Sequence, residues 1–426
     1  MSAKAVSRVA IVRRGGGGGS LVGSPIDEAV RKAVELIGGI SFFVKSGDRV
    51  VVKPNLAYPY PPPATTDPSV VEAVARLCVE AGAREVMVGD SSSYSCKNIL
   101  GYGRWSNMDV IRSTGMDKAA ERAGARIVDF DTAKWATVTI PGGVILRRTE
   151  IASPMLEADV VINVPAMKTH LETLATLAIK NYHGIIPDRW KIQFHKDEIS
   201  QKIVDIHKAV KTHLVVMDGL LGMEGLGPRM GSPVRMDLIL ASSDTVAIDA
   251  VTSHVMGIEP DEVETTRLAR AQGIGNGSLD SIQTVGLGIE EVRRPFRRPD
   301  VRISGIFPGV TVIQGGPCVH CYGRARVFLE TLQAEGLLVP GITDGAQAHG
   351  VPPNAGISTL LVGIKPRNPE IEEIQGDVVF VGDCAIESST NLRYGLGKRA
   401  LCLEGCPPIP SVHRVVDHLK KKYGKG

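Results

Sequence analysis

The sequence predicts an α/β protein with two domains: a larger domain built on a mainly parallel sheet, and a smaller α/β domain after it. Three observations support this prediction. Short apolar runs that end at proline, glycine or aspartate alternate with amphipathic stretches, as in parallel sheets covered by helices on both faces. A basic, proline-bearing run at residues 293–299 separates two such patterns. Five of the seven cysteines fall in the last 109 residues, so the second part is expected to have cysteine chemistry of its own.

The first strand and helix show how each element is predicted. Residues 48–54 form a short apolar run that a proline stops, as expected of a buried strand. Asp67 is a typical N-cap with Pro68 in the first helical position, which predicts a helix over 69–80 that Gly82 ends. The same reasoning predicts a strand at 85–90, a helix at about 108–123, and strands at 126–129, 159–163, 214–217 and 236–240.

After the basic run the alternation of strands and helices begins again. We predict strands at 309–313, 359–362, 378–381 and 400–403, and helices at 325–334 and 411–422. This is a small Rossmann-like arrangement of about 115 residues. The expected domains are therefore 1–292 and 309–426, joined by a basic linker at 293–308. The charges of the linker suit an exposed segment, or alternatively contact with an anionic partner.

Composition excludes several classes of protein. Lysine plus arginine is 49 and aspartate plus glutamate is 46, and aromatic residues make up only 4%. This argues against a dedicated nucleic-acid binder, which needs a concentrated basic face or stacking platforms. No run of about 18 apolar residues occurs, and the N-terminus lacks the layout of a signal peptide, so we expect a cytoplasmic protein without a membrane segment. The glycines at 15–19 lack the Lys-Ser/Thr ending of a P-loop, which favours a surface loop over a phosphate-binding one.

The strongest chemical signal is a set of cysteines at predicted strand ends. Cys318 and Cys321 form a CxxC pair after the strand at 309–313. Cys384 and Cys406 follow the strands at 378–381 and 400–403. Loops at the carboxyl ends of parallel strands converge on one edge of a sheet, so these four thiolates are predicted to meet. Four thiolates suit a [4Fe–4S] cluster or structural zinc. Cys402 lies inside an apolar strand and is expected to be a small buried hydrophobic residue. The sequence alone leaves open whether Cys406 or Cys402 is the fourth ligand.

Two resemblances favour iron–sulfur over zinc. The turn GCPP at 405–408 resembles the cluster-binding turn in the small subunits of nickel–iron hydrogenases and the related subunit of respiratory complex I. The second is to the family called "domain of unknown function 362", over about residues 48–260. Its signature segments are similar to KPN (53–55), VINVPAMKTH (161–170), IKNYHGIIP (179–187), DGLLGMEGLGP (218–228) and ASSDTVAIDA (241–250).

Members of that family often carry, or sit beside, [4Fe–4S]-binding segments. The resemblance therefore implies an iron–sulfur protein, with the cysteines here in a C-terminal Rossmann-like domain. These cysteines depart from the CxxCxxCxxxCP run of bacterial ferredoxins, so a two-cluster ferredoxin is not implied. The family name implies no reaction.

The first domain offers a predicted pocket of lysines and histidines. Such a pocket suits a small anionic substrate, a carboxylate or a phosphate, with a histidine for proton transfer near neutral pH. Lys168 and His170 are two residues apart, so on an extended segment they point to the same side. The alternative for any one of these residues is a solvated lysine or a histidine bonded to a loop carbonyl. The expected catalytic residues are Lys168, His170 and Lys180, and the expected substrate-binding residues are Lys53, Asn55, Asn181, His183, Asp218 and Glu224.

Three carboxylates form a second predicted set. Asp218 ends a strand, and Glu224 lies in a glycine-rich loop that we expect to fold back toward it. With Asp249 they would bind a divalent cation such as magnesium, or orient the lysines. Asp244 is instead predicted to cap the following helix. Two further histidines, His195 and His207, have no partner at a suggestive spacing and are expected at the surface.

Three functions follow as hypotheses. The leading one is an iron–sulfur oxidoreductase or electron-transfer protein that acts on a small anionic substrate and exchanges electrons with a redox partner protein. The second is a metal-dependent isomerase or racemase of the nickel type, in which the cysteines would hold a structural metal. The third is a non-enzymatic carrier or scaffold for iron–sulfur clusters. The substrate and the oligomeric state do not follow from the sequence.

Overall fold

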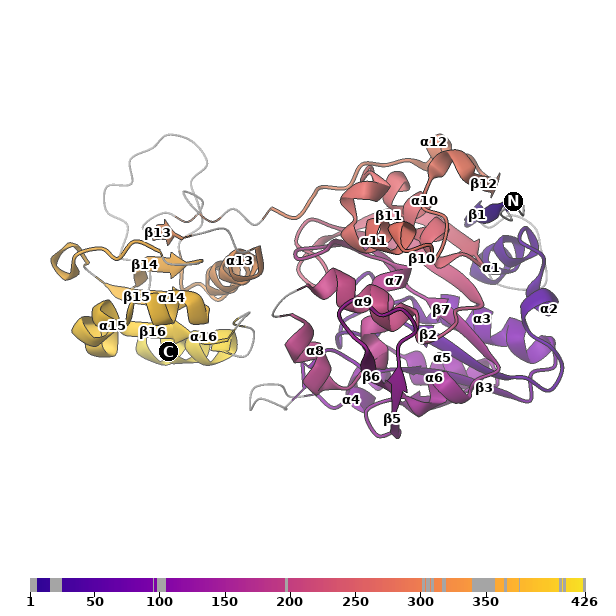
Figure 1. Cartoon of the computed structure of the whole chain (residues 1–426), viewed down its shortest axis with the longest axis horizontal. Coiled ribbons are helices and arrows are strands. Elements are labelled where there is room, and N and C mark those ends of the chain that lie inside the picture. Colours follow the sequence, from indigo (N-terminus) through magenta and orange to yellow (C-terminus); the bar gives the residue numbers. More distant parts are fainter. Residues whose placement is uncertain are drawn as a thin grey trace. The chain divides into compact units, whose positions relative to one another are not determined.

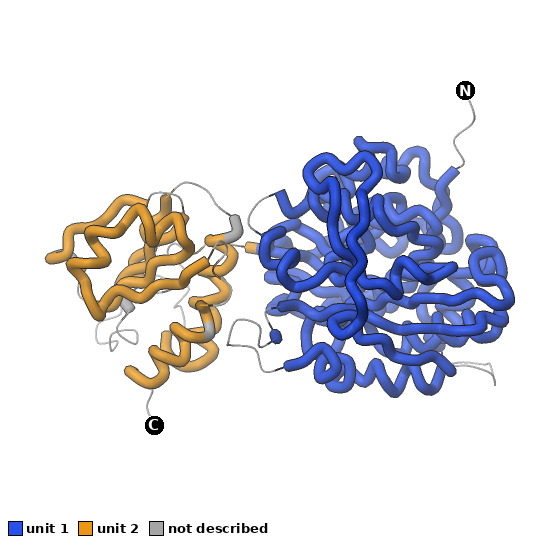
Figure 2. The backbone as a smooth tube through the Cα atoms, turned by 60° about the horizontal axis from the view of Figure 1, so that its bottom comes forward, with its two compact units in different colours: residues 1–98, 103–299 blue, residues 99–102, 300–426 orange. Residues whose placement is uncertain are grey.

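The chain folds into two compact units (Figures 1 and 2). The computed structural model describes residues 6–15, 25–94, 96–97, 105–195, 198–300, 303, 307, 310–315, 319–338, 357–363, 366–374, 376–405, 408 and 411–423. The first unit comprises residues 1–98 and 103–299, and the second comprises residues 99–102 and 300–426. Each unit is an α/β structure with its own sheet, which confirms the predicted fold class.

The first unit is built on a mainly parallel ten-stranded sheet. Its main path runs β12-β1-β11-β10-β7-β2-β3-β4, and β8 and β9 branch from β10. All neighbours along the path pair in parallel except β11, which is antiparallel to β1 and β10. The strands are β1 Ser7–Arg13, β2 Arg49–Pro54, β3 Glu85–Asp90, β4 Arg126–Asp129, β7 Val160–Val164, β8 Ala166–His170, β9 Leu174–Thr176, β10 Leu214–Glu224, β11 Ser232–Ser242 and β12 Ile282–Gly286. A separate hairpin pairs β5 Trp135–Thr139 with β6 Arg148–Ala152.

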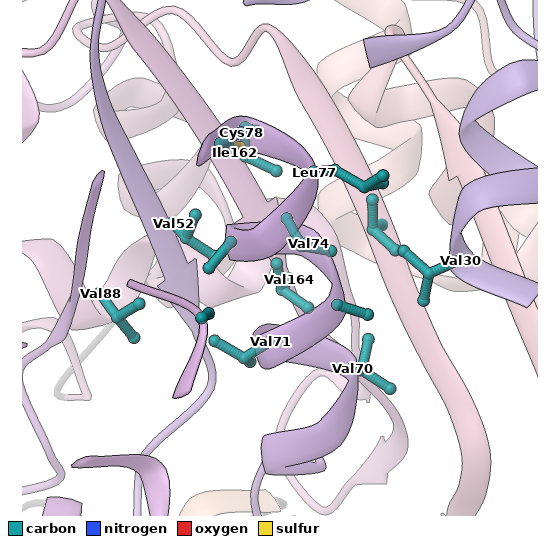
Figure 3. Packing of buried hydrophobic residues seen from close by; sticks show 14 of the residues in the cluster. Val30, Val52, Val70, Val71, Val74, Leu77, Cys78, Val88, Ile162 and Val164 are labelled. Atoms are coloured by element: carbon teal, nitrogen blue, oxygen red, sulfur yellow. The ribbon is translucent and has the colours of Figure 1, made fainter. Parts of the chain in front are cut away.

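Helices cover both faces of this sheet, and alternation along the strands decides which side chains meet which helices. Val50 and Val52 of β2 pack into one cluster with helices α1 and α3 (Figure 3), whereas Val51 between them packs into a cluster on the other face. The longer helices are α1 Pro25–Glu35, α3 Pro68–Glu80, α9 Ile199–His207, α10 Thr245–Val255 and α11 Glu264–Ala271. The shorter ones are α2 Ile40–Phe43, α4 Asn107–Ser113, α5 Met116–Arg122, α6 Ser153–Glu157, α7 Ala178–Asn181, α8 Asp188–Phe194 and α12 Ile289–Val292. Short 3₁₀ turns lie at η1 Tyr182–Ile185, η2 Pro260–Glu262 and η3 Leu279–Ser281.

Most predicted elements are confirmed, and the differences have local causes. Asp67 caps α3 by accepting a hydrogen bond from the Ser69 amide, as predicted. The helix predicted over 108–123 is two helices, because Gly115 between them has φ 74, a left-handed conformation that interrupts the helix. The strands predicted at 214–217 and 236–240 are longer than expected, Leu214–Glu224 and Ser232–Ser242. They extend because the two strands continue to pair with each other as far as Glu224 and Ser232. Glu224 therefore ends a strand, and its prediction as part of a folded-back loop was wrong.

The basic run at 293–299 is attached to the first unit. The Phe296 side chain is buried in a core cluster of that unit. Arg297 bonds to Glu224, and Arg298 pairs with Glu262 at 2.6 Å. The guanidinium groups nevertheless remain solvent-accessible, as the sequence predicted for this segment.

The second unit has four parallel strands in sequential order, β13-β14-β15-β16. They are β13 Thr311–Gln314, β14 Ile357–Val362, β15 Asp377–Val381 and β16 Ala400–Leu403. Helices α13 Val319–Ala334 and α16 Ser411–Tyr423 share a core cluster with one face of this sheet. On the other face, a second cluster includes α15 Thr390–Leu396, while α14 Asp383–Ser388 follows β15 directly. Two 3₁₀ turns, η4 Ile371–Glu373 and η5 Gly397–Arg399, complete the described part. Within the described parts of both units, no helix has the length and apolar character needed to cross a membrane.

Candidate functional site

A chain of three asparagines orients a buried lysine in the first unit. Lys168 on β8 is 1% exposed, and its Nζ donates to Asn55 Oδ1 at 2.6 Å and to the Ala64 carbonyl at 2.8 Å. Asn55 Nδ2 donates to Asn181 Oδ1 at 3.0 Å, and Asn181 Nδ2 donates to Asn163 Oδ1 at 2.7 Å. Each amide is thereby fixed in one orientation, so the Asn55 oxygen faces the amine. Of the predicted site residues, this chain brings together Asn55, Lys168 and Asn181.

Lys53 lies beside this chain but is already paired. Its Nζ is fully buried, 2.9 Å from Asp90 Oδ1, and also donates to the Pro54 carbonyl. The ion pair lies against Gly184, where an added Cβ would stand 2.0 Å from Asp90 Oδ1 and 2.9 Å from Lys53 Nζ. Only glycine fits there. Burial lowers the pKa of Lys53, and the neighbouring Asp90 opposes that shift. The charge of Lys53 is thus balanced inside the protein.

Lys168 and Asp218 can each gain or lose a proton near neutral pH. Burial lowers the pKa of Lys168 to about 7, with the charge of Asp218 opposing and that of Lys180 adding to the shift. Burial likewise raises the pKa of Asp218 to about 7, although its oxygens accept hydrogen bonds from the Asp67 and Leu220 amides at 2.7 and 3.0 Å. Paired groups with such shifted pKa values are characteristic of proton-transfer sites.

Three histidines and a glutamate form a cluster near Lys180. His170 Nδ1 accepts hydrogen bonds from the amides of Glu172 and Thr173 at 3.1 and 3.3 Å. His195 Nδ1 is 2.6 Å from Glu172 Oε2, and the His195 ring meets the His183 ring edge to face at 5.3 Å. Burial lowers the pKa of His183 well below its usual value, and the charge of Lys180 and the other two histidines adds to this shift, so His183 is neutral.

The prediction that His195 and His207 are surface residues was wrong, because both are buried. His207 packs edge to face on Tyr182 at 4.8 Å. Sequence reasoning missed Glu172 and His195 as site residues. They are 23 positions apart, on the β8–β9 turn and at the end of α8, and no spacing rule connects those elements.

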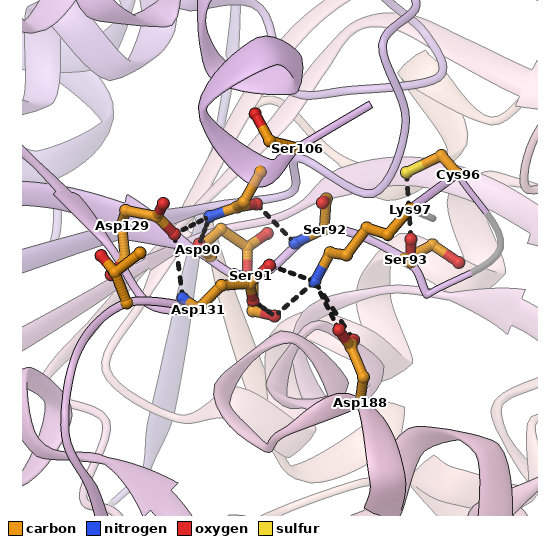
Figure 4. A network of polar contacts seen from close by, with 12 residues as sticks. Asp90, Ser91, Ser92, Ser93, Cys96, Lys97, Ser106, Asp129, Asp131 and Asp188 are labelled. Atoms are coloured by element: carbon orange, nitrogen blue, oxygen red, sulfur yellow. Dashed lines mark hydrogen bonds and ion pairs between the residues drawn. The ribbon is translucent and has the colours of Figure 1, made fainter. Parts of the chain in front are cut away.

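A second polar network lies at the carboxyl end of β3 (Figure 4). Lys97 Nζ pairs with Asp188 Oδ2 at 2.9 Å and donates to Ser91 Oγ at 3.2 Å. Lys191 also donates to the Ser91 hydroxyl, which bonds in turn to Asp131. Burial lowers the pKa of Lys191 to about 8, and the nearby charge of Lys97 adds to the shift. Both lysines have acidic partners, so this network supports the loop structurally rather than offering an unbalanced charge.

The three carboxylates predicted to bind a divalent cation have separate partners. Asp218 accepts from two backbone amides, as described above. Asp249 accepts from the Ala178 and Ile179 amides at 2.7 and 3.0 Å and so caps α7. Glu224 accepts from Arg297 Nε at 2.7 Å. Among the residues that the structure describes, no three His, Cys, Asp or Glu side chains form a group that could hold a metal ion.

In the second unit, the loops after β15 and β16 are bonded to each other beside a cysteine. The Gly382 amide donates to the Leu403 carbonyl at 2.9 Å, and the Gly405 amide donates to Asp383 Oδ1 at 2.7 Å. Cys321, in the first turn of α13, is 3% exposed. An added Cβ on Gly382 would stand 2.5 Å from its Sγ. Three strand-end segments therefore meet at the Cys321 sulfur.

The other cysteines fall into two groups. Cys384 is two residues after Gly382 and is the second residue of α14, whereas Cys318 and Cys406 lie outside the described residues. Cys402 packs with the cluster on the opposite face of the sheet from Cys321. Cys402 was predicted to be a small buried hydrophobic residue; it packs against apolar side chains but is only half-buried, and burial raises the pKa of its thiol. None of Cys321, Cys384 and Cys402 is in a disulfide bond.

Comparison with known proteins identifies relatives of the first unit. Residues 50–254 match the family described as "Domain of unknown function (DUF362)". Over 264 residues the chain is 31% identical to a thylakoid-associated protein of Synechocystis sp., an alignment that covers 60% of this chain and 76% of that protein. Among solved structures, the lactate racemase apoprotein from Thermoanaerobacterium thermosaccharolyticum superposes with a TM-score of 0.37 at 13% identity, over 60% of this chain and 58% of that one. That score is too low to bear on function. By its matching segment and its relative, this chain belongs to the family of domain of unknown function 362.

Proposed function

We propose that this chain is an iron–sulfur oxidoreductase or electron-transfer protein. Its second unit would hold one [4Fe–4S] cluster through Cys318, Cys321, Cys384 and Cys406, and its first unit would bind a small anionic substrate beside Lys168. When bound, such a cluster supplies one-electron transfer. A redox partner protein would then exchange electrons with it.

The observation that carries the proposal is the position of the Cys321 sulfur. It lies against Gly382, where the segments before Cys384 and Cys406 are joined by hydrogen bonds. Strand-end loops with cysteines thus approach one another, as a four-thiolate centre requires. The donor set is all sulfur, which suits iron–sulfur clusters and zinc but not hard cations such as magnesium. Glycines at these turns leave room for sulfur against the backbone, which fits a bulky cluster.

The anion-binding part of the proposal is supported by two lysine side chains that are shielded from water. Lys168 and Lys180 are both nearly buried, at 1% and 6% exposed. A buried cation strongly favours a nearby anion because water does not screen the interaction. Binding of an anion would also favour the charged form of Lys168, whose pKa is lowered to about 7 by burial. The fixed Asn55 oxygen holds the amine in one position.

The cluster is tested by measuring iron, zinc and acid-labile sulfide on the full chain purified without oxygen. About four irons and four sulfides per chain are expected. Cys321→Ser and Cys384→Ser should each lose most of the iron, whereas Cys402→Ser, the matched control on the opposite face of the sheet, should keep it. One zinc without sulfide would contradict the cluster and leave the site structural. Equal iron loss in all three variants would contradict the ligand assignment.

Anion binding is tested separately by calorimetry with acetate and with inorganic phosphate near pH 7. We expect at least one to bind, and Lys168→Met to weaken it about tenfold or more, since a tenfold change corresponds to about 1.4 kcal/mol. Glu224→Gln is the control, because Glu224 bonds to Arg297, whereas Lys168 bonds to Asn55 and to the Ala64 carbonyl. Equal affinity in the native chain and Lys168→Met would contradict the assigned site, whatever the iron content.

A further inference from the structure

A cavity of about 720 Å³ lies at the amino ends of β1 and β12 in the first unit. Ser7 and Ile282, which begin these two strands, line the cavity and lie opposite each other in the parallel ladder. The other walls come from Asp244, which caps α10, and from residues between 270 and 281, where the chain passes from the last turn of α11 through η3. A volume of this size is typical of sites that bind small molecules.

This cavity is at the opposite edge of the sheet from the asparagine that contacts Lys168. β1 and β2 run in the same direction, because β1 and β10 are both antiparallel to β11, while β10, β7 and β2 are parallel. Asn55 follows the carboxyl end of β2, whereas Ser7 is at the amino end of β1. The cavity is therefore separate from the proposed anion site, and what it binds goes beyond the proposed function.

The carboxylate of Asp244 shapes one wall but is fully used inside the protein. Its Oδ1 accepts hydrogen bonds from the Val246 and Ala247 amides at 2.9 and 3.0 Å. Its Oδ2 accepts from Ser7 Oγ at 2.6 Å and from the Asn276 amide at 2.9 Å. Four donors thus satisfy this carboxylate, and it holds β1, α10 and the loop after α11 together.

Two other charged side chains that line the cavity remain available to a ligand. Arg270 makes one ion pair, from Nη1 to Asp261 Oδ1 at 3.1 Å, so its Nε and Nη2 have no partner within the part of the chain that the structure describes. The stem of Arg270 packs on Gly277, where an added Cβ would stand 2.9 Å from Cδ. Asp280 is exposed and makes no hydrogen bond or ion pair with any described residue. A guanidinium edge and a carboxylate therefore line one cavity without pairing with each other.

Apolar surface lines the same cavity. Val6 is 64% exposed and Ile282 is half-buried, and both are among the lining residues. Covering such side chains with an apolar group removes them from water, which is favourable. The cavity thus offers a donor, an acceptor and an apolar wall.

We infer that this cavity binds a small zwitterion, either an amino acid or a short peptide with free ends, that has an apolar side chain. The ligand carboxylate pairs with the Nε and Nη2 edge of Arg270, because a guanidinium matches a carboxylate with two parallel hydrogen bonds. The ligand ammonium donates to Asp280, and the apolar side chain covers Val6 and Ile282. A simple anion or a simple cation would pair with only one of the two charged groups, so a zwitterion is preferred over both.

The ligand class is tested by calorimetry on the full chain near pH 7 with leucine and with leucylglycylglycine, which carry both terminal charges at this pH. We expect at least one to bind, and the tighter of the two gives the length of ligand that the cavity takes. Each single-charge analogue should bind about tenfold or more weakly than its parent. For leucine these are 4-methylpentanoate and 3-methylbutylamine, and for the tripeptide they are its N-acetylated and C-amidated forms.

Variants of the lining residues test the site itself. Arg270→Met and Asp280→Asn should each weaken binding of the zwitterion about tenfold or more. Both changes are compatible with the fold, because methionine keeps much of the stem that packs on Gly277, and Asp280 has no bond that asparagine would break. Arg267→Met is the matched control, since Arg267 is on the same helix but pairs with Glu264 and does not line the cavity.

Four results would overturn the inference: no binding of either zwitterion, an analogue that binds as tightly as its parent, native affinity in Arg270→Met or Asp280→Asn, or equal weakening in Arg267→Met. Lys168→Met should bind the zwitterion as the native chain does, because Lys168 bonds to Asn55 at the other edge of the sheet. Loss of zwitterion binding in Lys168→Met would place the ligand at that other site and would also overturn the inference. Failure of this inference is thus distinguishable from failure of the proposed anion site.

Discussion

Replacing Gly382 with alanine tests whether the Cys321 sulfur lies where the strand-end loops meet. Gly382 has φ 84 and ψ 155, a region that only glycine adopts readily, so alanine costs about 1–3 kcal/mol in backbone strain. The added Cβ would also stand 2.5 Å from Cys321 Sγ, well inside an ordinary contact of roughly 3.5–4 Å. The sulfur must then move by about 1 Å or more. Overpacking of this kind costs a further 1–3 kcal/mol, about as much again.

Gly397 provides a matched control in the same unit. It also has a positive φ, 55, but its added Cβ would have nothing within 4 Å. Gly397→Ala therefore has the backbone cost alone. Hydrogen exchange of peptides from β15 and β16 in the full chain should show Gly382→Ala less stable than Gly397→Ala by about 1–3 kcal/mol. Only Gly382→Ala should lose iron. Equal protection and equal iron content in the two variants would refute the placement of Cys321.

Three further perturbations test the first unit. Gly184→Ala places a Cβ 2.0 Å from Asp90 Oδ1 and should separate the buried ion pair of Asp90 with Lys53. The free energy of unfolding in urea should fall by about 3–5 kcal/mol, whereas Gly15→Ala, whose Cβ lies in open space, should change it little. Burial lowers the folded-state pKa of Lys168 from its usual 10.5 to about 7, so between these values the unfolded state binds more protons and stability rises with pH. Lys168→Met should remove a rise of up to about 1.4 kcal/mol per pH unit, measured by urea unfolding at about pH 7, 8 and 9, and an unchanged slope would count against this burial. Glu224→Gln breaks an exposed ion pair and should cost less than about 1 kcal/mol in the same assay, and a larger loss would mean that this pair is buried in solution.

The strands of both sheets could be predicted because each is a local pattern. β3 and β16 coincide with the predicted 85–90 and 400–403, since a buried parallel strand is a continuous apolar run with a stop after it. The helix after Asp67 was equally clear, because its cap and first-turn proline are adjacent in sequence. Elements whose ends depend on a distant partner were predicted less well. β10 and β11 extend beyond their apolar centres only because each satisfies the backbone groups of the other.

For the candidate sites too, local sequence patterns could be predicted and contacts between distant residues could not. A strand-end rule selected Lys53, Lys168 and Asp218, because parallel strands present their carboxyl ends at one edge. The prediction that Asp218 ends a strand was nevertheless wrong, because β10 continues past it to Glu224. The rule could not show that Lys53 is already paired with Asp90 or that Glu224 bonds to Arg297, because those partners are distant in the chain. Nor could it select His195, which reaches Glu172 only through the packing of α8.

By itself, the sequence determined two α/β units, the order of their strands along the chain, and which residue types stand at the strand ends. These depend on hydrophobic periodicity, caps and stops within about ten residues of each position. The tertiary structure decided which of those residues meet. It decided that three asparagines fix Lys168, that one glutamate bonds two histidines, and that Cys321 and Cys402 occupy opposite faces of one sheet. Burial and partners at long range set these contacts and the charge states that follow, and no local pattern encodes them.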